Sequence, residues 1–328
     1  MVIGMLGFGA MNYAVAVHLS RRSDNPKIVV WDIDEHIMET VRDERIHPYH
    51  FVEDVLPESI VTGTLDDFVD VDHVIIGMGA QNMRSAMVSA GTRLKKPYKT
   101  IVSKGLLGTG KRLSQVVQEE VGDDKIAMFA GGTVAHDLFY GNSLAADVAA
   151  IDPRVRYEVA ELLHSNTLRI YEVDDLVGVE LIAALKNIIS MGAGMAESLH
   201  NSVGTKSSFK IRLEYEVFQL AMKMGANMTT FLPGRPSWSG DTNLSSFGKT
   251  RNREYGMRIG GGEDPDDALK RMERGHKTVE GYYTLKVAHD LTRDMDTPCI
   301  DQLYAVVYGK VPPLEAEAAL MSRARRRD

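Results

Sequence analysis

A glycine pair between a short apolar strand and a helix is the feature that most constrains this fold. The apolar run at residues 2–6 leads directly into Gly7-Phe8-Gly9-Ala10-Met11-Asn12. The first glycine permits a tight turn after a strand, and the second lets the backbone approach a pyrophosphate at the N-terminus of the next helix. This placement predicts a βαβ unit that holds a dinucleotide on Gly7, Gly9, Ala10 and Met11.

Short apolar runs recur along the first half of the chain and alternate with stretches of helical period. We expect strands at residues 2–6, 28–31, 73–76, 100–103, 126–129, 145–149 and 168–171. Such alternation is typical of a mainly parallel, doubly wound sheet of the Rossmann type. The sequence therefore predicts an α/β dinucleotide-binding domain over residues 1–176.

The second half of the chain reads as helices only. We expect helices at residues 177–200, 207–224, 228–232, 264–270, 279–290, 297–308 and 313–322. Residues 233–262 are rich in Gly, Ser, Thr, Asn and Arg and show little periodicity, which indicates a long loop of the kind that is usually functional or disordered. We therefore expect an all-α substrate-binding and catalytic domain over residues 177–328.

Composition limits the partners of the chain. Its net charge of -7 argues against nucleic acid, because a phosphate-backbone binder needs clustered excess Lys and Arg. The basic residues at the C-terminus, Arg323, Arg325, Arg326 and Arg327, are expected to form a solvated tail. No secretory signal is visible, and no apolar run approaches the ~20 residues that span a bilayer. A cytoplasmic protein is expected.

The cysteine and histidine patterns offer no metal site. The chain has a single cysteine, Cys299, which fits a reducing compartment and is expected to pack in the core. His47 and His50 are three residues apart in a segment broken by Pro48, so we expect surface or loop histidines.

An acidic residue follows the second expected strand. Asp32 lies twenty residues beyond Asn12, where an acid accepts hydrogen bonds from the ribose hydroxyls and repels a 2'-phosphate. This favours NAD over NADP, although Asp32 could instead cap the next helix, for which Asp34 is a second candidate.

Two lysines are candidates for chemistry. Lys104 follows the strand expected at 100–103, at the sheet edge where ligands bind in this architecture, and could contact an anionic or carbonyl substrate. Lys186 lies in an otherwise apolar helical stretch, six residues past Glu180, so the two are not a simple surface pair. A buried lysine needs a partner and can act as acid or base, unless its side chain reaches out to solvent.

The polar segment supplies further candidates. Asp241 could orient a lysine, and the Arg251-Asn252 pair offers forked donors for a phosphate. A solvated loop is the equally simple alternative.

Taken together and in order, these positions resemble the NAD(P)-dependent glycerol-3-phosphate dehydrogenase family over nearly the full chain. The resemblance rests on five segments and on the stretch from Gly260 to Met321. The segments are the glycine turn, Ser103-Lys104-Gly105, residues 174–187 ending in Ala-Leu-Lys-Asn, the region from Gly240-Asp241 to Arg251-Asn252, and Val279-Glu280-Gly281. The family pattern differs at Asn12, which replaces the third glycine, and at Gly79-Ala80-Gln81-Asn82, which replaces a Pro-Ser pair.

The resemblance implies roles for individual residues. Lys186 matches the general acid/base and Lys104 matches a lysine that contacts substrate and cofactor. Asp241 matches the family's loop aspartate, Arg251 and Asn252 the pair that grips the substrate phosphate, and Glu280 an acid beside the nicotinamide end. The segment matching a substrate-lining Ser-Gly-Pro-Ser-Phe-Ala reads Ala130-Gly131-Gly132-Thr133-Val134-Ala135. The implied sites also include Ala135 and Arg251 for the cofactor, and Gly131, Thr133, Asn187 and Thr250 for the substrate.

The resulting hypothesis is hydride transfer between NAD(H) and dihydroxyacetone phosphate, with Lys186 delivering the proton. The family resemblance implies a homodimer. Two alternatives stay open, namely an NADH-dependent reductase of another small phosphorylated or phosphonate keto compound, and a catalytically silent NAD-binding redox sensor.

Overall fold

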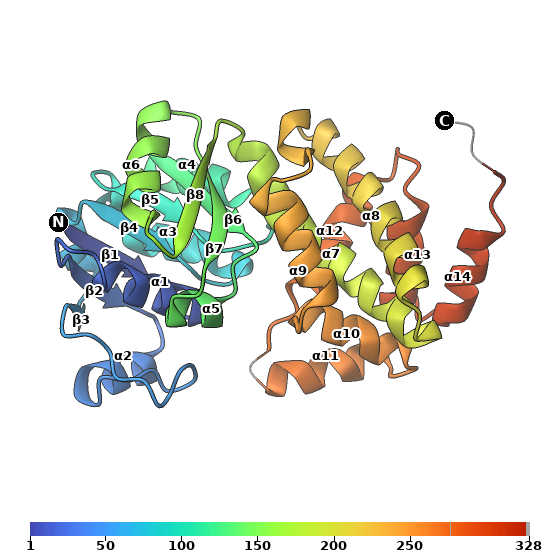
Figure 1. The fold of residues 1–328 in the computed structure, drawn as a ribbon, viewed down its shortest axis with the longest axis horizontal. Helices are drawn as coiled ribbons and strands as arrows, with labels where there is room; N and C mark the ends of the chain where they lie inside the picture. The colour runs from blue at the N-terminus through green and yellow to red at the C-terminus, as the bar shows by residue number, and fades with distance from the viewer. Residues whose placement is uncertain (276, 326–328) are drawn as a thin grey trace. The chain divides into compact units, whose positions relative to one another are not determined.

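The computed structural model describes residues 1–275 and 277–325, which form two compact units (Figure 1). The first unit consists of Met1–Lys104 and Lys111–Glu180, and the second consists of Gly105–Gly110 and the chain from Leu181 onward. Arg326 and Arg327 of the basic C-terminus lie outside the described residues.

A single sheet organises the first unit. Within the described residues it has eight strands in the order β3-β2-β1-β4-β5-β6-β7-β8, and all neighbours are parallel except β6 and β7. The fold is therefore a doubly wound Rossmann-type sheet, as predicted. The strands are β1 (Val2–Leu6), β2 (Lys27–Trp31), β3 (Ile60–Thr62), β4 (His73–Ile76), β5 (Tyr98–Ile101), β6 (Ile126–Gly131), β7 (Leu144–Ala149) and β8 (Leu168–Val173).

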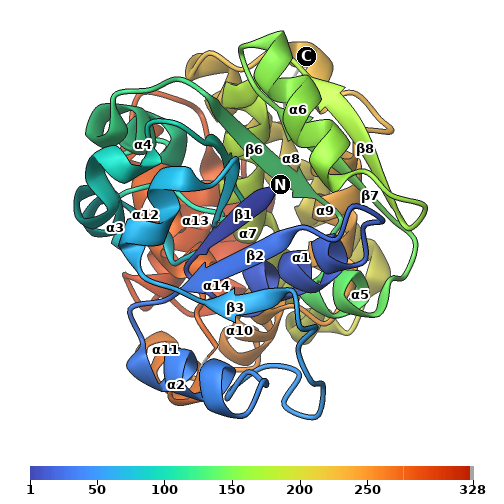
Figure 2. The same cartoon turned by 90° about the vertical axis from the view of Figure 1, so that its left-hand side faces the viewer.

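Helices cover both faces of this sheet. In Figure 2, α3 and α4 lie on one face, and α1, α5 and α6 lie on the other. His18 of α1 bonds the Leu163 carbonyl of α6 at 2.9 Å, which joins two of these helices. The helices of the unit are α1 (Ala10–Ser20), α2 (Glu35–Asp43), α3 (Met83–Ala90), α4 (Leu113–Val121), α5 (Ala135–Tyr140) and α6 (Pro153–Leu163).

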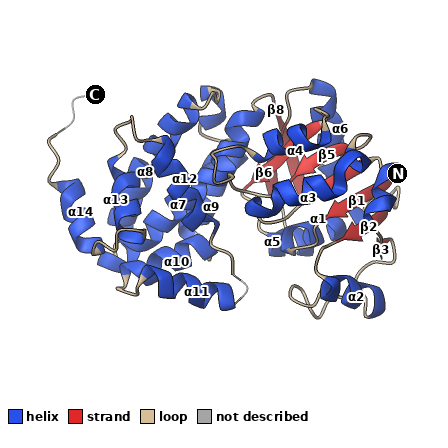
Figure 3. Ribbon diagram, turned by 180° about the vertical axis from the view of Figure 1, so that it is seen from behind, coloured by secondary structure: helices blue, strands red, loops and turns tan. Residues whose placement is uncertain are grey.

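Among the described residues, helices joined by loops form the second unit (Figure 3). Its first helix, α7 (Leu176–His200), begins with five residues of the first unit and continues without a break. The others are α8 (Val203–Lys223), α9 (Asp241–Phe247), α10 (Arg251–Gly260), α11 (Pro265–Arg274), α12 (Glu280–Leu291), α13 (Pro298–Val307) and α14 (Pro313–Met321). Cys299 is buried at the start of α13, as expected, and burial raises the pKa of its thiol.

The prediction of a long loop at residues 233–262 is wrong, because α9, α10 and a π-helical turn at Pro236–Gly240 occupy this segment. Residues with low helix propensity form these helices because several of them, such as Ser245, Ser246 and Gly256, are buried in tight packing.

Three smaller expectations also differ. The short strand β3 was not expected, the strand expected at 100–103 is β5 at Tyr98–Ile101, and Met228–Phe231 is a 3₁₀ turn. By length and composition α7 could cross a membrane, with a mean hydropathy of 1.6 over its most apolar window. However, 94% of that window is buried in the protein, which makes it a core helix.

Candidate functional site

The glycine turn between β1 and α1 has the geometry that a dinucleotide needs. Gly7 has φ +82°, and a Cβ added there would overlap the Gly77 carbonyl oxygen. A Cβ added at Gly9 would meet nothing within 4 Å, and no described side chain caps the N-terminus of α1. The amides of Gly9, Ala10 and Met11 therefore lie at the uncapped, positive end of a helix, which fits a pyrophosphate.

Asp32 is fixed beside this turn. Its carboxylate accepts the amide of Phe8 at 2.6 Å and the amide of Asp34 at 2.9 Å. Asp34, not Asp32, caps the next helix, because its side chain accepts the amide of His36 at 3.0 Å.

Asn12 is accommodated by a glycine that directly follows the neighbouring strand β4. Its Nδ2 donates to the carbonyls of Gly7 at 2.6 Å and Ile75 at 3.2 Å. A Cβ added at Gly77 would overlap the Asn12 amide group. The close approach that a third glycine would allow at position 12 is thus replaced by an asparagine that ties the turn to the sheet.

The other first-unit candidates follow β5 and β6. Lys104 comes two residues after Val102, and Ser103 accepts the amide of Met78 at 2.8 Å. Gly131 ends β6, where a Cβ would overlap Ala146 of β7, and Ala135 begins α5. Thr133 is 5% exposed, and its Oγ1 has no hydrogen-bond partner among the described residues, so a buried hydroxyl is left for a ligand.

Lys186 is the centre of the polar cluster in the second unit. It is buried in α7, and its Nζ lies 2.8 Å from Asp241 Oδ1 and 2.6 Å from Ser245 Oγ. Asp241 is 1% exposed, and Ser245 Oγ donates to the same carboxylate oxygen at 3.1 Å. The lysine does not reach out to solvent, because a buried ammonium is held by a buried carboxylate.

Ser245 was not identified from the sequence. It lies one helical turn after Asp241, on the same face of α9, but the segment was interpreted as a loop without periodicity. Ser190 also belongs to this cluster, since its hydroxyl donates to the Ser245 carbonyl at 2.6 Å. Thr250 donates to the same carbonyl at 2.8 Å.

Asn187, Asn252 and Gly281 join three helices. Asn252 Nδ2 donates to Asn187 Oδ1 at 2.9 Å, and its Oδ1 accepts the amide of Gly281 at 2.8 Å. Arg251 is exposed at the first position of α10, and no described side chain caps that helix. An exposed guanidinium and open amides at a helix N-terminus can together bind an anion.

Glu280 begins α12. Burial raises the pKa of its carboxyl group above the usual range, and the nearby positive charge of Arg251 partly offsets that effect.

Glu180 has a structural role in the first unit. It accepts from Arg112 Nη1 at 2.7 Å and from the amide of Ser114 at 2.8 Å, which holds the start of α4.

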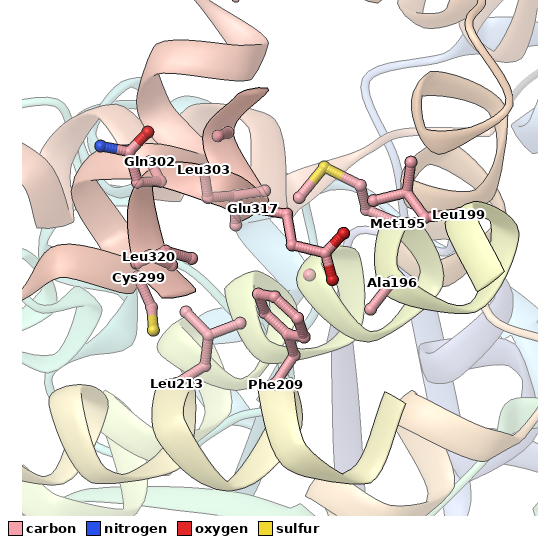
Figure 4. Close-up of a pocket in the computed structure, with 12 residues that line it drawn as sticks. Met195, Ala196, Leu199, Phe209, Leu213, Cys299, Gln302, Leu303, Glu317 and Leu320 are labelled. Carbon is pink, nitrogen blue, oxygen red and sulfur yellow. The ribbon is translucent and has the colours of Figure 1, made fainter. Parts of the chain in front are cut away.

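A small cavity in the second unit is separate from these residues (Figure 4). Its volume of about 20 Å³ admits roughly one water molecule. None of the candidate site residues line it; its walls include Met195, Leu199, Phe209, Leu213, Leu303 and Leu320. Among the described residues, no group of three or more His, Cys, Asp or Glu could hold a metal ion.

Comparison with known proteins identifies the family. The family model described as the NAD-dependent glycerol-3-phosphate dehydrogenase N-terminus matches residues 2–155, and that of the C-terminus matches residues 175–318. A glycerol-3-phosphate dehydrogenase [NAD(P)+] of Shewanella sp. (strain MR-4) is 29% identical over 97% of this chain and 95% of its own length. The corresponding protein of Bartonella henselae is 27% identical over 97% of this chain and 94% of its own length.

Solved structures share the fold. The glycerol-3-phosphate dehydrogenase of Coxiella burnetii matches 98% of this chain and 99% of its own, with a TM-score of 0.89 and 22% identity. A PanE/ApbA family ketopantoate reductase of Ralstonia eutropha matches less well, with a TM-score of 0.59 and 12% identity. Since the two family models together match nearly the whole chain, this protein belongs to the NAD-dependent glycerol-3-phosphate dehydrogenase family.

Proposed function

We propose that this chain catalyses reversible hydride transfer between NAD(H) and the carbonyl carbon of dihydroxyacetone phosphate, yielding glycerol 3-phosphate. The observation that carries the proposal is the buried ammonium of Lys186, held by Asp241 and Ser245 in a chain of this family. When NAD(H) is bound with its pyrophosphate at the glycine turn, its nicotinamide ring would donate or accept the hydride. The residues of the chain bind the two ligands and move the proton.

Lys186 is the proposed general acid in the direction of reduction. Hydride arrival at carbon leaves an alkoxide, and an ammonium that donates to that oxygen stabilises the charge as it forms. Asp241 and Ser245 both accept from Nζ, which fixes the position of the ammonium in the cluster. In the direction of oxidation the neutral amine would take the proton back.

Arg251 and Asn252 are proposed to anchor the substrate phosphate at the N-terminus of α10. Asn252 is already fixed by Asn187 and Gly281, which pre-organises its side chain and positions Arg251 beside it. Phosphate binding away from the reacting carbon supplies energy for orientation. Lys104 and Thr133 are proposed to contact the substrate from the first unit, and Ala135 and Glu280 to contact the cofactor.

The test of this proposal is NADH oxidation with dihydroxyacetone phosphate by wild type and Lys186→Ala. Loss of the acid should lower kcat by about 10²- to 10⁴-fold. Lys210→Met is the matched control, because Lys210 is also a buried lysine of the second unit, and its Nζ pairs with Glu214 within α8 at 2.5 Å.

Equal rates for Lys186→Ala and wild type would remove Lys186 from its role. A wild-type protein inactive on dihydroxyacetone phosphate but active on another phosphorylated or phosphonate keto compound would change the substrate. Tight NADH binding without turnover of any compound would indicate a redox sensor.

We also propose that the protein is a cytoplasmic homodimer. Its single buried cysteine is compatible with a reducing compartment, and the dimer follows from the family resemblance. Light scattering coupled to gel filtration would give the mass, and a monomer at micromolar concentration would contradict the dimer.

A further inference from the structure

A buried histidine contacts the glycine turn from a neighbouring loop. His47 is 0% exposed, although the sequence suggested a surface or loop histidine without a specific contact. Its Nε2 lies 2.7 Å from the Phe8 carbonyl oxygen. Its Nδ1 accepts the amides of Tyr49 at 3.1 Å and His50 at 3.2 Å.

These contacts define the protonation of the ring. A nitrogen that accepts two N–H groups carries no proton, so Nδ1 is bare and Nε2–H is the donor to Phe8. The imidazole is therefore neutral. The pKa of His47 is lowered to about 4, chiefly by burial; the charge of His50 also lowers it, while the Phe8 carbonyl and Asp34 act in the opposite direction.

The ring also packs among four aromatic side chains. Its centroid lies 5.9 Å from Phe8 of the turn, 5.4 Å from Tyr13 of α1, and 4.8 Å from His50 of its own loop. The Tyr49 ring lies 6.0 Å away. The titratable groups around the ring are thus Tyr13, Asp34, Tyr49 and His50.

Side chains hold the turn at three points. Asn12 bonds the Gly7 carbonyl, Asp32 bonds the Phe8 amide, and His47 bonds the Phe8 carbonyl. The Phe8 carbonyl and the Gly9 amide belong to one planar peptide group and point in opposite directions. A donor that fixes the carbonyl on the protein side therefore fixes the Gly9 amide on the open side of the turn.

We propose that His47 is a positioning residue for the coenzyme, because its Nε2–H orients the Phe8–Gly9 peptide whose amide bonds the pyrophosphate. This inference rests on the proposed binding of NAD(H) at the turn. It assigns His47 to coenzyme affinity and not to the hydride-transfer step.

Two substitutions separate the contacts of the ring. His47→Gln can place an amide N–H near the position of Nε2 but loses the acceptor at Nδ1. His47→Asn can place an acceptor near Nδ1 but loses the donor to Phe8. The matched control is His73→Gln, since His73 is also buried in the first unit, has a pKa lowered by burial to about 4, and stacks on Tyr98 away from the turn.

The readout is the Kd for NADH from fluorescence titration at pH 7.5, with melting curves to confirm that each variant is folded. His47→Asn should weaken NADH binding by about tenfold, as expected for a lost hydrogen bond and an unsatisfied carbonyl. His47→Gln and His73→Gln should stay within about threefold of wild type. In turnover assays, His47→Asn should raise KM for NADH and leave kcat unchanged.

Wild-type affinity for His47→Asn would overturn the proposal, and so would equal losses in His47→Asn and His47→Gln, which would assign the effect to loop packing. The titration needs no substrate. Absence of turnover with dihydroxyacetone phosphate would therefore contradict the proposed reaction without touching this result, whereas a wild type that binds no NADH would overturn the inference.

Discussion

Asp32 shows how one carboxylate can shape a turn and also select a ligand. Both oxygens accept backbone amides, from Phe8 and from Asp34, so the charge is held in one place beside the turn. A carboxylate has room for about four hydrogen bonds, and acceptor positions remain for ribose hydroxyls. A 2'-phosphate at that place would meet a fixed negative charge.

We therefore expect wild type to bind NADH at least about tenfold more tightly than NADPH, since like charges at close range cost on the order of a few kcal/mol. Asp32→Asn keeps the shape of the side chain and removes its charge, so it should lower the ratio of the Kd for NADPH to the Kd for NADH. The measurement is the Kd for each coenzyme. Asp24→Asn is the control, because Asp24 is an exposed acid whose partner is Arg22. Comparable affinities of wild type for NADH and NADPH would contradict the proposed role of Asp32 in coenzyme selection.

Single site residues were predictable where burying the side chain without a partner would cost free energy. Lys186 is recognisable because a lysine among apolar helix neighbours needs a partner, and Asp241 because a carboxylate can supply one. Ser245 and His47 were not recognisable. Their roles depend on a main-chain carbonyl or a helix face that other segments bring to them, and no spacing in the sequence encodes such a contact.

At the scale of elements, α10 approaches α7 through glycines. A Cβ added at Gly256 would overlap the Met191 carbonyl, and one added at Gly260 would overlap the Met195 carbonyl. Gly194 of α7 has the same relation to Arg253 of α10. This close approach brings Asn252 within hydrogen-bond distance of Asn187.

Gly256→Ala should therefore destabilise the second unit by about 1–3 kcal/mol, the usual range for overpacking, although alanine is the better helix former. Gly204→Ala is the matched control, because Gly204 lies in α8, where an added Cβ would meet Ser202 Oγ at an ordinary contact distance of 3.7 Å, and it should gain up to about 1 kcal/mol. Urea unfolding followed through Trp238, in a Trp31→Phe background, would measure both. A stabilised Gly256→Ala variant would contradict the tight contact.

Helices and strands were predictable from the sequence where they have a clear hydrophobic pattern. The buried strands β1, β4 and β6 and the helix α7 are apolar runs long enough to recognise. The strand β3 has only three residues, and α9 and α10 are built from serines and glycines whose small size serves the packing. Their signal therefore resembles that of a loop.

At the scale of the whole molecule, three buried histidines of the first unit make the stability of the fold sensitive to acid. Burial lowers the pKa of His18, His47 and His73, the latter two to about 4. In the unfolded chain these groups titrate near 6.5. Between pH 6.5 and 4 the unfolded chain binds more protons than the folded one, so the free energy of unfolding must fall as the pH falls.

Between pH 7.5 and pH 5, the lowered pKa values of His47 and His73 should each reduce the free energy of unfolding by about 2 kcal/mol. The check is urea unfolding at both pH values, followed through Trp31 in a Trp238→Phe background. His73→Gln should lose less stability over this interval than wild type. A wild-type stability that stays constant from pH 7.5 to pH 5 would show that these rings are protonated in the folded state.

The chain passes between its two units three times, at Lys104–Gly105, Gly110–Lys111 and Glu180–Leu181. The last passage lies inside the continuous helix α7, and Gly105–Gly110 belongs to the unit that contains Leu291, beside Gly110. No single cut can therefore release either unit whole. A gene that exchanged one unit for that of another dehydrogenase would need three crossover points, one of them inside α7, so the two halves are expected to be inherited together.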